Sequence, residues 1–201
     1  MPRLIIGLLA LLLSLAFHAA SAQQRPVVTI DAGHGGEQAG VVIGDIIEKD
    51  VVLRAAFAFA EEFAARGYDV HLTRTGDETI GFQERTDMAE AAGSFLMISL
   101  HTNRSDADSV HGMVIFTDLE NTRTAVVASA VADAVRETGS RVTVVGRDAG
   151  FLKSETVAVL MMEMGYLSHP VERRLVLSSD YHHELGAKIA EAMREVAGRL
   201  D

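Results

Sequence analysis

Short apolar runs alternate with longer segments of helical periodicity along most of the chain. Runs rich in β-branched and other apolar residues predict strands at residues 27–31, 68–73, 95–100, 113–117, 141–145 and 156–162. Apolar residues three or four positions apart predict helices at residues 46–66, 81–92, 121–137 and 181–200. This alternation predicts an α/β fold: a mostly parallel open sheet of about five or six strands with helices on both faces.

Residues 1–22 have the pattern of a secretory signal peptide. Arg3 precedes an apolar run at residues 4–17, which is too short to span a bilayer comfortably, and Ala20-Ser21-Ala22 matches a cleavage site. A retained membrane anchor and a buried helix are the alternatives. Cleavage would leave an exported protein without a stable membrane anchor, located in the periplasm, or secreted if the cell has no outer membrane.

Nothing in the sequence divides the remaining residues, 23–201, into more than one domain. The chain has 201 residues, of which 48% are apolar, and this is enough for one sizeable core. It contains no internal repeat, no low-complexity tract and no linker rich in Pro, Ser or Gly. We therefore expect a single domain over 23–201.

Charge and composition exclude several classes of function. The formal net charge is −10, from 18 Lys and Arg against 28 Asp and Glu, which argues against nucleic acid as a partner. The chain has no Cys, which excludes disulfides, thiolate metal sites and Cys nucleophiles. No G-x-S-x-G motif occurs, so a serine-hydrolase nucleophile elbow is unsupported.

Polar residues follow three of the predicted strands, at the sheet edge where α/β proteins bind ligands. Asp31 and His34 follow the first strand, His101 follows 95–100, and Glu163 follows 156–162. Glu48 lies near the start of the first long helix, whose N-terminus should face the same edge. Two His and one carboxylate match the His₂Glu pattern of catalytic zinc sites, and a further carboxyl in apolar surroundings suits proton transfer.

Each candidate also has an ordinary structural interpretation. His34 can be a polar residue in a Gly-rich loop, and His101 can be a strand-terminal His that bonds to backbone. Glu48 can be a first-turn acid favoured by the helix dipole. Glu163 is harder to explain structurally, because a buried unpaired carboxylate costs several kcal/mol.

Four short motifs occur in a fixed order along the chain. They are Asp31-Ala32-Gly33-His34-Gly35-Gly36, Glu48-Lys49-Asp50, Ser99-Leu100-His101-Thr102-Asn103 and Glu163-Met164-Gly165-Tyr166-Leu167-Ser168-His169-Pro170. Together they resemble the zinc-dependent N-acetylmuramoyl-L-alanine amidases of the type-3 amidase family. The resemblance extends over residues 27–197, nearly all of the chain after the predicted signal peptide.

This resemblance implies a set of roles. His34, Glu48 and His101 would bind Zn²⁺, and Glu163 would be the catalytic carboxylate. The substrate would be peptidoglycan, cut at the amide between the lactyl group of N-acetylmuramic acid and L-Ala. The rival hypotheses are a zinc carboxypeptidase-like peptidase acting on wall peptides, and a non-enzymatic wall-binding module.

The chain departs from the family pattern at three positions. Ala32 stands where the family commonly has Pro, His169 where it has Asn, and Val114 where it often has Glu. The change at Val114 bears on substrate contacts along that strand, not on the metal. We expect a catalytic domain with no separate wall-targeting domain and no inserted blocking helix; whether a protein activator is needed is left open.

Three further polar residues have two interpretations each. Asp31 is either a carboxylate that orients a zinc-bound imidazole or a residue that caps its loop. Arg85 and Asn103 either contact substrate or brace a loop, and bracing a loop is the favoured interpretation for both.

Overall fold

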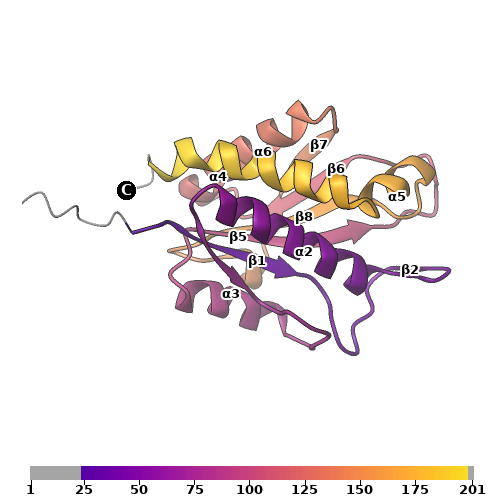
Figure 1. Cartoon of the computed structure of the whole chain (residues 1–201), viewed down its shortest axis with the longest axis horizontal. Coiled ribbons are helices and arrows are strands. Elements are labelled where there is room, and N and C mark those ends of the chain that lie inside the picture. Colours follow the sequence, from indigo (N-terminus) through magenta and orange to yellow (C-terminus); the bar gives the residue numbers. More distant parts are fainter. Residues whose placement is uncertain (1–23, 199–201) are drawn as a thin grey trace, which may run out of the picture.

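The computed structural model describes residues 24–198. The predicted signal peptide, residues 1–22, lies outside the described residues, as do residues 199 and 200 of the last predicted helix. Six strands form one sheet in the order β4-β1-β5-β8-β6-β7 (Figure 1). The strands are β1 (Val27–Ala32), β4 (Asp69–Leu72), β5 (Leu96–Asn103), β6 (Met113–Thr117), β7 (Val142–Gly146) and β8 (Ala158–Tyr166).

Most of the sheet is parallel, as predicted. β4, β1, β5 and β8 run in one direction, and β6 is antiparallel to β8. β7 is parallel to β6, so the last two strands form a reversed pair at one side of the sheet. The carboxyl ends of β1, β5 and β8 therefore lie together at one edge.

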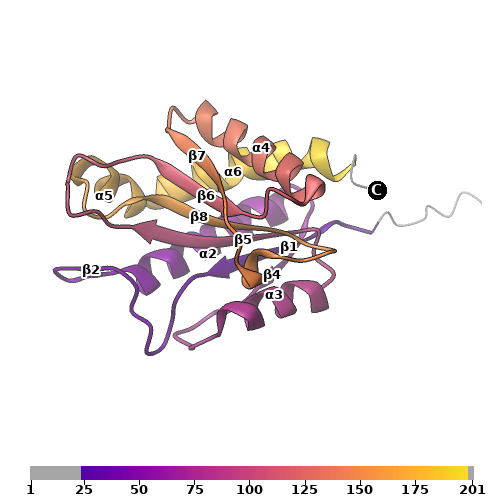
Figure 2. The ribbon, with the colours of Figure 1, turned by 180° about the vertical axis from the view of Figure 1, so that it is seen from behind.

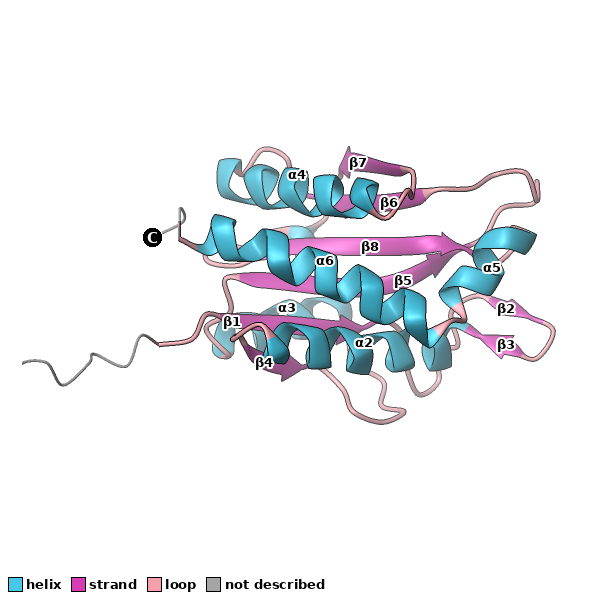
Figure 3. Ribbon diagram, turned by 45° about the horizontal axis from the view of Figure 1, so that its top comes forward, coloured by secondary structure: helices cyan, strands magenta, loops and turns pink. Residues whose placement is uncertain are grey.

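Helices cover both faces, which confirms the predicted layers. α2 (Glu48–Ala65), α4 (Thr122–Glu137) and α6 (Ser179–Ala197) lie on one face (Figure 3). They enclose the larger core, in which residues such as Phe59, Ile98 and Met162 are fully buried. On the other face, α3 (Phe82–Ala91) and the 3₁₀ turn η1 (Gly150–Leu152) cover a smaller core (Figure 2).

The first long helix begins later than predicted. Residues 46–47 belong to a short hairpin in which β2 (Val42–Ile43) pairs with β3 (Ile46–Ile47). The turn contains Gly44, whose φ of 58° is easily reached without a side chain. Ile46 and Ile47 are apolar and fit the helical spacing of the residues that follow them, which is why the sequence predicts a helix from residue 46. In the structure they form strand β3 of the hairpin, and α2 starts at Glu48.

Two strands run further than their apolar sequences predicted. His101 lies inside β5 and Glu163 inside β8, and these two residues are direct partners in the parallel ladder. The prediction that both follow their strands was wrong by a few residues. Backbone hydrogen bonds continue a strand through polar residues, whereas an apolar run marks only its buried part.

One helix was not predicted. α5 (Pro170–Val176) begins after His169, whose Nδ1 accepts a hydrogen bond from the Glu172 N–H at 3.2 Å. It is short and carries several charged residues, so its apolar periodicity is weak. Within residues 24–198, no helix combines the length and apolar character needed to cross a bilayer.

Candidate active site

The loop after β1 carries His34 in an unusual backbone conformation. His34 has a φ of 57°, a left-handed value that non-glycine residues seldom adopt. Two buried arginines hold the carbonyl groups around it. Arg85 donates to the Ala32 and His34 carbonyls (both 2.7 Å), and Arg74 donates to the Ala32 and Gly33 carbonyls (both 2.8 Å). The loop conformation that presents His34 is therefore fixed by side chains from outside the loop.

Asp31 anchors this loop rather than orienting an imidazole. It is fully buried, and its carboxylate accepts hydrogen bonds from Arg85, Thr73 and Ser99. No hydrogen bond joins Asp31 to a His ring among the described residues. Of its two predicted roles, the bracing role is the one that these contacts support.

Glu48 occupies the first position of α2 and points toward the same edge. Its Oε2 accepts the Val41 N–H at 2.7 Å, and its Oε1 accepts the Thr102 N–H at 2.7 Å. The residue is 2% exposed, so both carboxylate oxygens are fixed in a buried position. An acid present only to complement the helix dipole would not need two backbone donors from other segments.

His101 reaches the site from β5, and two glycines make room for the cluster. A Cβ on Gly33 would lie 2.4 Å from atoms of the His101 ring. A Cβ on Gly40 would lie 2.5 Å from Glu48 Oε2 and 2.7 Å from the His34 ring. Neither contact is possible for a side chain, so the close packing of the three residues requires glycine at both positions.

The three side chains converge on one point. His34 Nε2 lies 3.2 Å from Glu48 Oε1, His101 Nδ1 lies 3.3 Å from the same oxygen, and the two ring nitrogens are 3.1 Å apart. Ligands of a tetrahedral zinc ion, at about 2.0–2.2 Å from the metal, are about 3.3–3.6 Å from one another. The three observed separations lie at or just below this range, so small side-chain shifts would bring the donors to the spacing of a zinc site. Among residues 24–198, these three residues form the group that could hold a metal ion.

The cluster has the electrostatics of a cation site. Burial alone would raise the pKa of Glu48, but hydrogen bonds from His101 and His34 hold it well below its usual range. Burial disfavours the charged form of His101, yet its hydrogen bond to Glu48 and the charges of Glu163 and Glu48 raise its pKa. The site thus favours positive charge beside the Glu48 carboxylate, which a bound metal ion would supply in place of a proton.

Glu163 stands beside this cluster without being part of it. It lies opposite His101 in the sheet, and its Oε2 is buried without a hydrogen-bond partner among the described residues. Burial raises the pKa of Glu163, and the positive charges of His101, His34 and Arg147 offset only part of that effect. A carboxyl group in this state can take up and release a proton.

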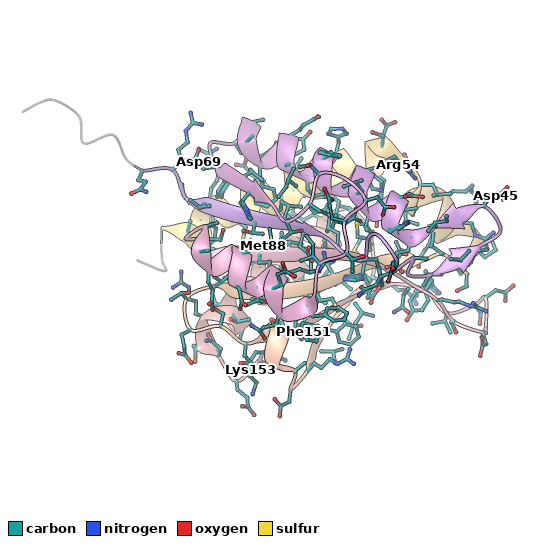
Figure 4. The ribbon with its side chains drawn as sticks, turned by 90° about the horizontal axis from the view of Figure 1, so that it is seen from below. Asp45, Arg54, Asp69, Met88, Phe151 and Lys153 are labelled. Atoms are coloured by element: carbon teal, nitrogen blue, oxygen red, sulfur yellow. The ribbon has the colours of Figure 1, made fainter. Side chains whose placement is uncertain are left out.

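A cavity of about 800 Å³ opens onto these groups. Its remaining lining comes from the start of the β2–β3 hairpin and the residues before it, the start of α3, the end of β5, β8, and the segment from the end of β7 to η1. These residues are Gly40, Val41, Val42, Phe82, Thr102, Asn103, Arg104, Arg147, Phe151 and Met161. Figure 4 shows Phe151 near α3 and Asp45 at the tip of the hairpin. Phe82 and Phe151 stack with ring centroids 4.9 Å apart, so one part of the wall is apolar.

Four residues that the sequence motifs predict to form the site lie together at the cavity: His34, Glu48, His101 and Glu163. Asn103 also lines the cavity, whereas Arg85 braces the loop. Two residues were missed. Arg74 is buried because it donates hydrogen bonds to loop carbonyl groups, and the apolar periodicity of a sequence does not predict such contacts. Arg147 follows the short edge strand β7 and belongs to none of the four motifs.

Comparison with known proteins gives consistent results. The model of the N-acetylmuramoyl-L-alanine amidase family matches residues 28–195. The amidase AmiC of Neisseria meningitidis serogroup B is 33% identical over 94 residues, 46% of this chain and 23% of that protein.

Two solved structures share the fold. The catalytic domain of the amidase CwlV from Bacillus (Paenibacillus) polymyxa var. colistinus has a TM-score of 0.78 at 23% identity, covering 86% of this chain and 98% of that one. An amidase from Clostridium difficile 630 has a TM-score of 0.80 at 21% identity, covering 88% and 98%. The chain spans between 23% and 58% of the length of the first curated relatives that it matches.

Proposed function

Because the chain belongs to the N-acetylmuramoyl-L-alanine amidase family, we propose that it hydrolyses the amide bond between N-acetylmuramic acid and L-Ala in peptidoglycan. The observation that carries this proposal is the convergence of His34, Glu48 and His101 within 4.8 Å of one another beside the unpartnered carboxyl of Glu163. Family and site support the same chemistry, since this donor set is that of a zinc hydrolase.

In this proposal His34, His101 and Glu48 would hold a zinc ion, through the ring nitrogens and the carboxylate oxygen that lie close together. The backbone N–H groups of Val41 and Thr102 orient the Glu48 carboxylate, and the Arg85 and Arg74 braces keep His34 in its position. When bound, zinc supplies a Lewis acid that polarises the amide carbonyl and lowers the pKa of water.

Glu163 performs the proton transfers. Burial raises its pKa above the ordinary value of a Glu carboxyl, which suits a group that first takes up a proton and then returns it. It accepts a proton from the attacking water and then delivers a proton to the nitrogen of the departing L-Ala. The C–N bond breaks, and the products are the lactyl carboxylate and a free stem peptide.

The proposed substrate lies outside the cytoplasmic membrane, so the enzyme must act there. The predicted signal peptide at residues 1–22 supplies the route of export. We place the protein in the periplasm, or outside the cell where there is no outer membrane.

Digestion of purified peptidoglycan tests the function. The protein should release free stem peptides and leave glycan strands intact, lose activity with a chelator and regain it with added zinc. New amino groups within the stem peptides would instead support the carboxypeptidase-like alternative. Wall binding without turnover, unchanged in Glu163→Gln, would support a binding module, and activity that ignores the chelator would contradict the zinc mechanism.

A further inference from the structure

Arg147 is an exposed arginine that lines the cavity. Its N–H donates to the Thr117 carbonyl at 2.9 Å, which attaches the segment after β7 to the end of β6. Its guanidinium carbon lies 5.3 Å from the centroid of the Phe116 ring. Within residues 24–198 no carboxylate lies at ion-pair distance from it, and the adjacent Asp148 is paired with Lys153 at 2.8 Å. The guanidinium therefore lies over the Phe116 ring, and its N–H donors are not occupied by an ion pair with a carboxylate of the described residues.

The sheet register places Arg147 on the far side of Glu163 from the metal cluster. His101 on β5 is opposite Glu163 on β8, and Glu163 is opposite Val114 on β6. Phe116, under Arg147, is two residues further along β6 and so shares the face of Val114. Across this face of the sheet the order is therefore His101, then Glu163, then Arg147 over Phe116. Val114 contributes no charge, so no acid from that strand competes for the guanidinium.

If the chain has the proposed function, the order His101, Glu163, Arg147 sets the direction in which the substrate lies. Glu163 delivers its proton to the L-Ala nitrogen, so the peptide leaves on the Glu163 side of the metal cluster. The sugar and lactyl group then lie on the other side. The peptide therefore extends toward β6 and Arg147.

The spacing indicates which peptide group reaches Arg147. Neighbouring strands are about 4.8 Å apart and two residues along a strand about 6.6 Å, so Phe116 lies about 8 Å from Glu163 across the sheet. An extended peptide covers about 3.5 Å per residue, so about 8 Å is slightly more than the length of two residues, which leads from the L-Ala nitrogen to the far end of the residue after L-Ala. In peptidoglycan that residue is a γ-linked D-glutamate whose α-carboxylate is either free or amidated.

We propose that Arg147 binds the free α-carboxylate of this second stem residue and makes the enzyme selective for non-amidated stem peptides. The inference rests on the proposed function, because that function sets the direction of the peptide. A guanidinium that binds a carboxylate through paired hydrogen bonds discriminates strongly against a neutral amide. The charge of the cavity agrees: outside the cluster and Glu163, its charged lining residues are Arg104 and Arg147, in a protein of net charge −10.

Two soluble substrates that differ in one group test the proposal. They are N-acetylmuramoyl-L-Ala-γ-D-Glu-L-Lys and the same compound with D-isoglutamine in place of D-glutamate. We expect the zinc-loaded wild type to cleave the carboxylate form with a kcat/KM about 10- to 100-fold higher. Arg147→Gln should lose that preference through slower cleavage of the carboxylate form alone, while Arg147→Lys should keep part of it.

Arg104→Gln is the matched control, because Arg104 lines the same cavity, is exposed and has no ion pair among the described residues. It should lower the two rates equally and keep the preference. A wild type without preference, or a preference that Arg104→Gln removes and Arg147→Gln keeps, would overturn the proposal.

Binding of the free tripeptides to Glu163→Gln, measured by calorimetry, separates the two hypotheses. Carboxylate-dependent binding that needs Arg147, with no cleavage of either substrate by the wild type, would overturn the proposed function but not the carboxylate site. Cleavage of both substrates at equal rates, with equal binding of both tripeptides, would overturn the carboxylate site and leave the amidase function intact.

Discussion

The two sides of the cavity are built in opposite ways. On the β1, β5 and α2 side, polar atoms are paired: Glu48 accepts two backbone N–H groups, and Asp31 accepts from three side chains. On the β8, β6 and β7 side, Glu163 has a buried oxygen without a partner and Arg147 has no carboxylate, among the described residues. The paired side is suited to holding an ion in fixed geometry, and the unpaired side is suited to receiving a proton and a substrate.

The largest effect is expected at the unpaired side. Glu163→Gln should reduce amidase activity by about 10²- to 10⁴-fold, because the amide cannot act as the base. Zinc content and thermal stability should stay at the wild-type level or rise, since a buried carboxyl without a partner is removed. Peptidoglycan digestion measures the activity, metal analysis of the purified protein measures the zinc content, and calorimetry measures the thermal stability.

Glu155→Gln is the control for this substitution, because it makes the same chemical change at an exposed glutamate. It should leave activity unchanged. If Glu163→Gln retained full turnover, the assignment of proton transfer to this residue would be wrong.

The next effect concerns the paired side. Glu48→Gln should weaken zinc binding by at least about 100-fold, since even changes to groups that only support metal ligands commonly cost 10- to 100-fold. The variant should still fold, and its zinc affinity can be measured by competition with a chelating dye. Asp50→Asn removes an exposed acid from the same first helical turn, so equal loss of zinc in the two variants would favour the helix-dipole interpretation of Glu48.

The contribution of Arg85 to the paired side of the cavity can be measured as a change in stability. Arg85→Met should lower the unfolding free energy by about 3–5 kcal/mol, because it leaves the buried Asp31 carboxylate without its cationic partner, with only the Thr73 and Ser99 hydroxyl groups to donate to it. Urea unfolding of the zinc-free protein measures this loss. The double variant Arg85→Met with Asp31→Asn should recover part of it; no recovery would mean that the Arg85 contacts to loop carbonyls dominate.

The smallest effect lies away from the cavity, at His182 on α6. It is buried, with Nε2 2.8 Å from the Val176 carbonyl oxygen, and burial lowers its pKa below the ordinary 6.5. The unfolded chain therefore takes up a proton that the folded protein excludes, so this residue's contribution to stability is present above pH 6.5 and declines as the pH falls below it.

His182→Gln should flatten this part of the pH dependence. The measurement is urea unfolding of the zinc-free wild type and variant between about pH 8 and about pH 5. Identical pH slopes in the two proteins would show that His182 does not cause the loss of stability at acid pH.

Much of the architecture could be predicted from sequence. All six strands of the main sheet and four of the helices correspond to predicted segments, because apolar periodicity follows directly from which faces are buried. Helix α5 and the β2–β3 hairpin escaped prediction, since one is short and polar and the other imitates a helical pattern. The predicted ends of β5 and β8 lie a few residues before the observed ends, because backbone pairing continues beyond the apolar residues.

The candidate site divides in a similar way. Sequence order and strand ends selected His34, Glu48, His101 and Glu163, since parallel strands bring their carboxyl ends to one edge. Arg74 could not be selected, because its role is to contact carbonyl groups of a loop whose conformation exists only in the folded chain.

By itself, the sequence determined the layered α/β fold and the residue types that meet at one edge, because both depend on local periodicity and strand direction. Only the tertiary structure decided that His34 Nε2 and His101 Nδ1 lie close to each other and to the Glu48 carboxylate. It also decided that one Glu163 oxygen has no hydrogen-bond partner among the described residues and that Arg147 lies over Phe116. These features depend on packing between segments far apart in the chain, where shifts of an ångström decide whether polar atoms are paired.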